Sequence, residues 1–248
     1  MKTISFINLK GGVGKTTVSS NVAYALAASY GAKVLFIDND KQGNASSWFN
    51  VSAGEKSLTN ILLDGAKVKD VVQKTRYENI DIIASDMDLM EANLAVLTDT
   101  EIEQQKILQK ALAEVKEQYE ICIIDNPPDI NISVLNALVV TDEVIIITTP
   151  DAYGLQGVHQ MVKQIELAKQ YNPNLLFRGV LMNKFASTFY GFDYISELKK
   201  QYPVFKIKLR FTKEKMDVST LKKVSIFELS PGCGFARDLV KFLDELLA

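Results

Sequence analysis

The segment that most restricts how this chain can fold is a glycine-rich loop at residues 8–17, with the sequence NLKGGVGKTT. A short apolar run at residues 4–7 precedes the loop, and residues 18–28 follow it with a helical pattern. A strand that enters a glycine-rich turn and continues as a helix is the setting of a phosphate-binding loop, because the backbone N–H groups at the start of the helix point toward phosphate oxygens. The sequence therefore predicts a nucleotide site at the first turn between strand and helix.

This loop is a variant of the common pattern, which has glycine six residues before its lysine. Leu9 occupies that position, and a second lysine, Lys10, follows it. Lys15 is expected to reach the β- and γ-phosphates of ATP, and the Thr16 hydroxyl is expected to ligate Mg²⁺. Glycines allow the backbone to approach the phosphates, which a Cβ atom would obstruct. The residues predicted to bind the nucleotide here are Lys10, Gly11, Gly12, Val13, Gly14, Lys15, Thr16 and Thr17.

Apolar runs typical of strands alternate with helical patterns along the rest of the chain. Strands are predicted at residues 34–37, 80–83, 121–124, 144–148 and 176–182, with a weaker one near 204–207; helices are predicted at 101–118, 157–170, 194–200 and 235–247. The strands lack polar alternation, as expected when helices cover both faces of a parallel sheet. We therefore predict one α/β domain over residues 1–248, with a doubly wound, mainly parallel sheet and the architecture of a P-loop NTPase.

Composition excludes several other classes of protein. Apolar residues make up 47% of the chain, enough for a large core, but no run reaches the roughly 18 apolar residues of a membrane span. The first strand begins so early that we expect no signal peptide, and hence a cytoplasmic location. Cys122 and Cys233 lack the spacing of a metal site, and His159 is expected to be structural. The chemistry is therefore expected to lie in the loop and at the strand ends.

Acidic residues follow two of the predicted strands. Asp38 and Asp40 end the second strand, and Asp125 ends the run at 121–124. An aspartate after a buried strand is the second element of a phosphate-loop NTPase, where it holds Mg²⁺ through a water molecule. Thr16, Asp40 and Asp125 are the expected Mg²⁺ ligands. Asp38 and Asp40 are the nearest candidates to orient an attacking water, although Asp38 is equally compatible with a structural role as a cap.

Positive charge is concentrated in one segment. Residues 199–223 hold nine basic and two acidic side chains, a net charge of +7, in a chain whose net charge is −2. Such asymmetry is typical of a protein with an anionic partner, and it is also compatible with an ordinary solvated basic face.

Taken together, these motifs resemble the ParA family, the deviant-Walker ATPases that partition plasmids and chromosomes. The likeness covers nearly the whole chain, and its most specific parts are residues 10–17, 38–46, 125–128 and 150–157. It implies a sandwich homodimer formed with ATP, in which Lys10 crosses to the partner's phosphates. It implies that Lys10, Lys15 and Asp40 serve catalysis, that Asp40 helps to activate water, and that Asn183 reads adenine. It further implies nonspecific DNA binding on the nucleoid and a ParB-like centromere-binding protein that stimulates hydrolysis.

The chain departs from the family pattern in three places. Lys41 stands where proline is usual, beside the predicted water-activating Asp40, and Asp129 replaces a small residue. Without the proline ring the loop that carries Asp40 has more conformational freedom. The sequence therefore does not decide how rigidly Asp40 is held or how fast ATP is hydrolysed. The stretch 185–190 lacks the arginine with which relatives often contact DNA. DNA contacts are therefore expected from the basic segment, at Lys206, Lys208, Arg210, Lys213 and Lys215.

Two other functions fit the same loop. A MinD-like membrane-positioning ATPase would need a C-terminal membrane helix, but residues 235–247 carry mixed charge without the basic excess that anionic lipids favour, so we expect this helix to pack on the sheet and no stable membrane anchor. A nucleotide-bound scaffold that positions a cargo other than DNA would show negligible turnover. Partition by an ATP-hydrolysing dimer is the expected function.

Overall fold

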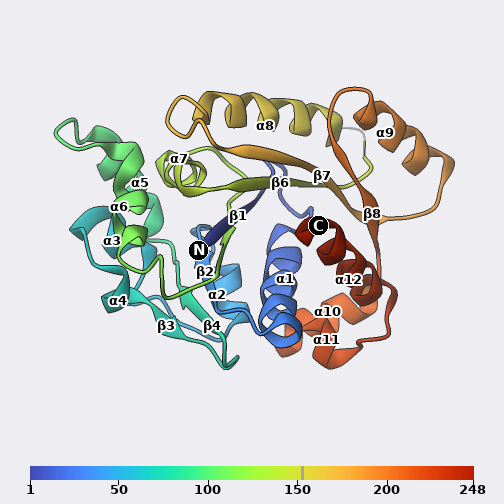
Figure 1. Ribbon diagram of the computed structural model, residues 1–248, viewed down its shortest axis with the longest axis horizontal. Helices are drawn as coiled ribbons and strands as arrows, with labels where there is room; N and C mark the ends of the chain where they lie inside the picture. Colours follow the sequence, from blue (N-terminus) through green and yellow to red (C-terminus); the bar gives the residue numbers. More distant parts are fainter. Residues whose placement is uncertain (152–153) are drawn as a thin grey trace.

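A single mostly parallel sheet forms the centre of the molecule. The computed structural model describes residues 1–151 and 154–248 (Figure 1). The strand order is β3-β4-β2-β5-β1-β6-β7-β8, and every neighbouring pair is parallel except β3 with β4. The strands are β1 (Lys2–Ile7), β2 (Val34–Asp38), β3 (Gln73–Lys74), β4 (Ile80–Ile83), β5 (Ile121–Asp125), β6 (Glu143–Thr148), β7 (Leu176–Phe185) and β8 (Val204–Arg210).

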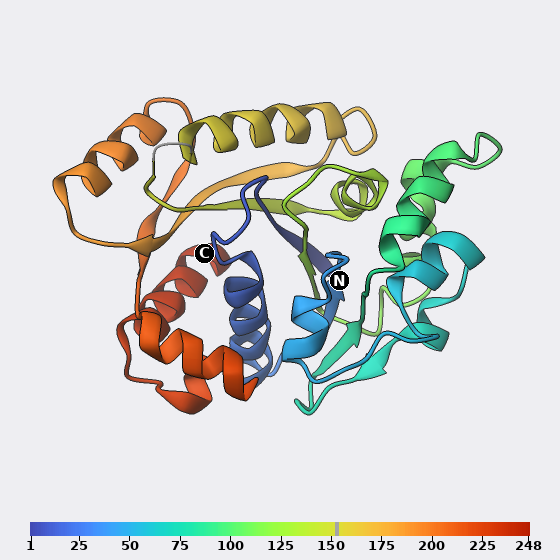
Figure 2. The same ribbon diagram turned by 180° about the vertical axis from the view of Figure 1, so that it is seen from behind.

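Helices cover both faces of this sheet, which confirms the predicted doubly wound α/β architecture. Helices α1, α2, α11 and α12 pack on one face, beside α10, and α3 to α9 pack on the other (Figures 1 and 2). The helices are α1 (Lys15–Tyr30), α2 (Asn44–Trp48), α3 (Leu58–Asp64), α4 (Val68–Val71), α5 (Leu89–Thr98), the 3-10 turn η1 (Gln104–Lys106), α6 (Ile107–Ala113), α7 (Ile132–Val140), α8 (Gly154–Ala168), α9 (Phe189–Lys199), α10 (Lys213–Lys222), α11 (Ile226–Leu229) and α12 (Gly234–Leu247).

The central strands are apolar on both faces because each face meets a helical layer. In β1, Ile4 and Phe6 belong to the core under α1, whereas Ile7 belongs to the core under α7 and α8. Because β2, β5 and β1 are neighbours and run in parallel, the loops after them meet at one edge of the sheet. Ligands of doubly wound sheets bind at this edge.

The prediction of one helix over residues 101–118 is wrong. That segment contains a 3-10 turn followed by α6, which ends at Ala113. The buried side chain of Asn136 explains the break, because its Oδ1 accepts a hydrogen bond from the Leu108 N–H at 3.0 Å and its Nδ2 donates to the Gln104 carbonyl at 2.7 Å. These contacts satisfy backbone groups that a continuous helix would pair internally.

The C-terminal helix packs on the sheet, as predicted. Leu239, Phe242 and Leu246 of α12 are at most 1% exposed and lie in the core that also contains Phe205 and Leu209 of β8. The apolar face of α12 is therefore already covered within the chain. Among the described residues, no helix is both long enough and apolar enough to cross a membrane.

Candidate nucleotide-binding site

The glycine-rich loop is fixed at its base and left-handed at two of its glycines. Asn8 joins the loop to β6, since its Nδ2 donates to the Ile147 carbonyl at 2.6 Å while its Oδ1 accepts from the Lys10 N–H at 3.0 Å. Gly12 and Gly14 have φ angles of +74° and +91°, which residues with a Cβ atom rarely adopt. Gly14 is also the N-cap of α1, so the positive end of this helix faces the loop.

Lys15 is held inside the loop. Its side chain is buried, and its Nζ donates to the carbonyls of Asn8 at 3.1 Å and Lys10 at 3.4 Å. Burial lowers the pKa of this ammonium, although Asp125, Asp40 and Asp129 lie close enough to oppose the shift. Phosphate oxygens can take the place of these two carbonyls as acceptors, so the position suits the predicted role of Lys15.

Thr16 and Asp125 form the polar centre of the site. The Thr16 hydroxyl donates to Asp125 Oδ2 at 2.6 Å, and Asp125 Oδ1 is buried with no hydrogen-bond partner among the described residues. Burial raises the pKa of Asp125 to about 6, against the hydrogen bond from Thr16 and the charge of Lys15. A buried, unpaired carboxylate oxygen beside a threonine hydroxyl fits a hydrated Mg²⁺ ion, which prefers oxygen ligands. These residues could therefore hold the metal as predicted.

Asp38 is engaged in holding the neighbouring loop. Its Oδ2 accepts from both the N–H and the hydroxyl of Ser46 at 2.7 Å, and its Oδ1 accepts from the Asp40 N–H at 3.2 Å. Asp38 pairs in register with Asp125 across β2 and β5, and burial, with the charge of Asp125 as the second cause, raises the pKa of Asp38 to about 7. This geometry favours the structural role of Asp38 over direct chemistry.

Asp40 lies at the edge of the same loop, 8% exposed, and its Oδ1 accepts from the Gln42 N–H at 3.0 Å. Two of the three departures from the family pattern, Lys41 and Asp129, meet beside it. Lys41 Nζ lies 3.7 Å from Asp129 Oδ2, which joins the Asp40 loop to the loop after Asp125. The ion pair supplies a restraint in a loop that lacks the proline ring.

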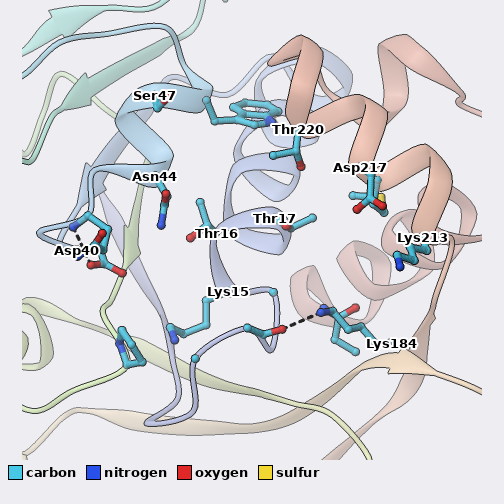
Figure 3. A pocket seen from close by; sticks show the side chains of 18 of the residues that line it. Lys15, Thr16, Thr17, Asp40, Asn44, Ser47, Lys184, Lys213, Asp217 and Thr220 are labelled. Carbon is cyan, nitrogen blue, oxygen red and sulfur yellow. Dashed lines mark hydrogen bonds between the residues drawn. The ribbon is translucent and has the colours of Figure 1, made fainter.

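The end of β7 closes the loop from the opposite side. Asn183 Nδ2 donates to the Val13 carbonyl at 2.8 Å, and Lys184 Nζ donates to the Gly12 carbonyl at 2.7 Å, as Figure 3 shows for Lys184. The predicted adenine-reading Asn183 is thus in contact with the loop. Lys184, whose ammonium lies 5.5 Å from the centre of the Phe211 ring, was not predicted, because its left-handed backbone (φ +51°) leaves no sequence signal at a lysine.

A cavity of about 860 Å³ is lined by residues of the glycine-rich loop with Asp40, Asn183 and Lys184, whereas the buried Asp38 and Asp125 are not among its described lining residues. Figure 3 shows Lys15, Thr16 and Thr17 at its centre, Asp40, Asn44 and Ser47 on one side, and Lys184, Lys213, Asp217 and Thr220 on the other. Its volume is within the range of small-molecule sites. Six of the eight loop residues predicted to bind the nucleotide therefore line one cavity with Asp40 and Asn183: Gly11, Gly12, Gly14, Lys15, Thr16 and Thr17.

Val13, which is buried in the core, is not among the described residues that line this cavity, and neither is Lys10. Lys10 Nζ lies 2.6 Å from Asp151 Oδ2, and both side chains are about one-third exposed. Asp151 belongs to the segment at residues 150–157 that resembles the ParA family, of which Ala152 and Tyr153 lie outside the described residues. The Lys10–Asp151 contact was not predicted, since the two residues are far apart in the sequence.

The five residues predicted to contact DNA differ in their surroundings. Arg210 pairs with Asp238 through two contacts of 2.7 Å and lines the nucleotide cavity, as does Lys213. Lys215 Nζ donates to Ser230 Oγ at 2.9 Å. Lys206 and Lys208 are on β8, the edge strand, where lysine also discourages pairing with another sheet. DNA binding by this segment stays a prediction.

Comparisons with known proteins show which proteins this chain resembles. A family model described as an AAA domain matches residues 1–177. The chain is 36% identical to the sporulation initiation inhibitor protein Soj of Bacillus subtilis over 81% of its own length and 80% of that protein. It is 30% identical to the virulence plasmid ParA family protein pGP5-D of Chlamydia psittaci, over 99% of this chain and 94% of that one.

A solved structure with the same fold contains the expected ligands. Cobyrinic acid a,c-diamide synthase of Mycobacterium smegmatis, crystallised with an ATP analogue and magnesium, superposes with a TM-score of 0.85 at 25% identity, covering 100% of this chain and 94% of that one. The sheet order, the loop geometry and the relatives lead to one conclusion. The chain belongs to the ParA/Soj family of P-loop ATPases.

Proposed function

We propose that this chain hydrolyses ATP with Mg²⁺ and that two copies, joined by ATP, complete each other's active sites. The observation that carries the proposal is the position of Lys10, whose ammonium pairs with Asp151 outside the cavity of its own chain. From that position the lysine can reach the nucleotide of a second copy and stabilise charge on the γ-phosphate, as an arginine finger does. Hydrolysis would then depend on dimerisation.

Within each copy, the other site residues have separate roles in binding the nucleotide and in hydrolysis. Lys15 exchanges its two carbonyl acceptors for the β- and γ-phosphate oxygens, and the N–H groups of the loop cradle the phosphates. Thr16 and Asp125, with Asp40, would hold Mg²⁺, and the bound ion would supply positive charge to the phosphate oxygens. Asp40 orients the attacking water. Asn183 positions adenine with its Oδ1 while its Nδ2 stays on the loop.

We further propose that the ATP-bound dimer binds DNA nonspecifically, on the nucleoid in the cytoplasm, and acts in plasmid or chromosome partition with a ParB-like partner that stimulates hydrolysis. The likeness to Soj and to pGP5-D supports this function. The basic segment at residues 199–223 supports the DNA contact, because a dimer presents two copies of it and gains affinity through counterion release. Lys206 and Lys215 are exposed and Lys208 is half-buried, so all three are accessible to phosphates, whereas Arg210 would have to leave Asp238.

The test compares three proteins: the wild type, Lys10→Ala and Lys15→Ala. Phosphate release should fall by at least about tenfold in Lys10→Ala, while its affinity for ATP changes little. In Lys15→Ala both should fall. Unchanged turnover in Lys10→Ala would refute the role of this lysine in the partner's site.

The DNA arm measures binding to duplexes of unrelated sequence with ATP, with ADP and without nucleotide. Binding should require ATP and weaken steeply between about 50 and 200 mM salt. The variant Lys206→Glu/Lys208→Glu should bind DNA more weakly and hydrolyse ATP normally. DNA binding that is indifferent to both nucleotide and salt would contradict the partition proposal.

A further inference from the structure

Helix α5 is apolar on two opposite faces. Its inner face, with Leu89, Ala92 and Val96, is buried in the core. Its outer face, here called the α5 stripe, is exposed to solvent. The stripe consists of Met87, Met90, Leu94 and Leu97, which are 52%, 49%, 62% and 60% exposed. Met90, Leu94 and Leu97, spaced by four and three residues, lie along one line of α5, and Met87 lies in the turn just before the helix. Contiguous exposed apolar side chains of this kind mark a contact surface.

The segment that carries the α5 stripe is acidic. Residues 86–103 contain six acidic side chains and no basic one: Asp86, Asp88, Glu91, Asp99, Glu101 and Glu103. In the described part of the chain only Glu103 among them forms an ion pair, with Lys106 and Lys110. Two copies related by a twofold axis through this face would bring like charges together, which is unfavourable. The complementary ligand is an amphipathic helix with a basic polar face.

The α5 stripe is joined to the ATPase site. Met87 Sδ accepts a hydrogen bond from Gln42 Nε2 at 3.7 Å, two residues from Asp40. Just before the stripe, the Ser85 N–H donates to Ser46 Oγ at 3.0 Å, and Ser46 in turn binds Asp38. A ligand on this face would therefore touch the elements that hold the Asp40 loop.

A second connection reaches the other side of the site. Asn93 Oδ1, in the middle of α5, accepts from the Ser133 N–H at 2.8 Å at the start of α7. This turn of α7 follows the loop that carries Asp129, the partner of Lys41. Both loops that meet in the Lys41–Asp129 pair are thus supported by α5 or by the segment just before it.

We propose that the α5 stripe binds a basic amphipathic helix of the protein partner and transmits that binding to the Asp40 loop through Gln42 and Met87. The regulatory half of this inference rests on the proposed ATPase function, whereas the binding half does not. Leucine-type side chains of the ligand cover the stripe, and its lysines or arginines face the six acidic residues. A bound helix fixes the Asp40 loop and raises turnover.

The test uses the full chain and a defined probe, a fluorescein-labelled 18-residue helical peptide of leucine and lysine with leucines spaced by three and four. Anisotropy should show saturable binding that weakens at least tenfold in Leu94→Glu/Leu97→Glu. This variant adds two negative charges, so electrostatics alone would tighten binding, and a loss isolates the apolar contact. Leu221→Glu is the matched control, because Leu221 is 84% exposed on α10 and should leave affinity unchanged.

Three results would overturn the assignment: equal affinity in wild type and Leu94→Glu/Leu97→Glu, equal affinity for a peptide with glutamates in place of the lysines, or loss of ATP-dependent dimerisation in the variant by sedimentation velocity. The last result would mean that the α5 stripe binds a second copy of the chain. Phosphate release separates the two halves of the inference. Binding without faster turnover would refute the coupling to Asp40, and a chain with no turnover at all would refute the proposed function while anisotropy still decides the docking.

Discussion

The ion pair between Lys41 and Asp129 yields a prediction specific to this chain. The pair holds the loop of Asp40 against the loop after Asp125, so its loss should let the Asp40 loop leave its working position. Two unit charges 3.7 Å apart attract by about 1 kcal/mol in water. Measured values for exposed pairs reach about that figure, and these side chains are 34% and 41% exposed. A loss of about 1 kcal/mol corresponds to about a fivefold change in an equilibrium constant.

Lys41→Ala and Asp129→Ala should therefore each lower the turnover of ATP by up to about fivefold, with little change in ATP affinity. The double variant should be no slower than the slower single variant, because the second change removes a partner that is already unpaired. Phosphate release under single-turnover conditions is the assay. The difference should shrink as salt rises toward 1 M, where the Debye length is about 3 Å.

The matched control is Lys169→Ala, which breaks an exposed ion pair with Glu166 at the C-terminal end of α8 and should leave turnover unchanged. Two outcomes would refute the reasoning. One is a double variant whose loss equals the product of the two single losses, because the residues would then act independently. The other is an Asp129→Ala defect that is equally large at 1 M salt, because an ion pair could not be its cause.

Three further predictions concern the polar centre and the loop. Because burial raises the pKa of Asp125 to about 6, protons should compete with Mg²⁺ below that pH, and the affinity for Mg·ATP should fall by up to about tenfold per pH unit. Calorimetric titrations between pH 5 and 7.5 measure this affinity, and an affinity that does not change with pH would contradict the prediction. The raised pKa also means that the ionised Asp125 carboxylate destabilises the metal-free fold above pH 6. Asp125→Asn should therefore raise the melting temperature of the nucleotide-free protein at pH 8, by about 2–4 °C for each kcal/mol relieved, while it weakens Mg²⁺ binding. A lower melting temperature with normal Mg²⁺ binding would count against the site. Asn183→Ala leaves the buried Val13 carbonyl without its donor, at a cost of about 1–3 kcal/mol, and should weaken ATP binding more than Leu221→Ala, an exposed control, in a fluorescent-nucleotide titration.

Local sequence patterns predicted the elements that carry the chemistry. The loop at residues 8–17 and the aspartates at the ends of β2 and β5 are each recognisable from a short stretch of sequence. The parallel sheet order then brings these stretches together. The apolar strands were predictable for the same reason, since each is a short run covered on both faces.

Contacts between distant residues were not predictable. The pairs Lys10–Asp151 and Lys41–Asp129 join positions 141 and 88 residues apart, and no local rule indicates such contacts. The break in the helix expected at 101–118 depends on Asn136, a side chain of another helix. The α5 stripe was missed because a helix apolar on both faces shows no clear periodicity between core and solvent.

The central claim is that Lys10 acts on the nucleotide of the other copy while Asp40 acts on that of its own. Mixing Lys10→Ala with Asp40→Ala tests it directly. Each variant alone should form ATP-dependent dimers with almost no turnover. In a mixed dimer the copy with Lys10→Ala keeps its own Asp40 and receives Lys10 from its partner, so one of the two sites is complete. With random pairing, an equimolar mixture should recover about a quarter of the wild-type rate of phosphate release. A mixture that forms dimers and stays as inactive as its components would contradict the account.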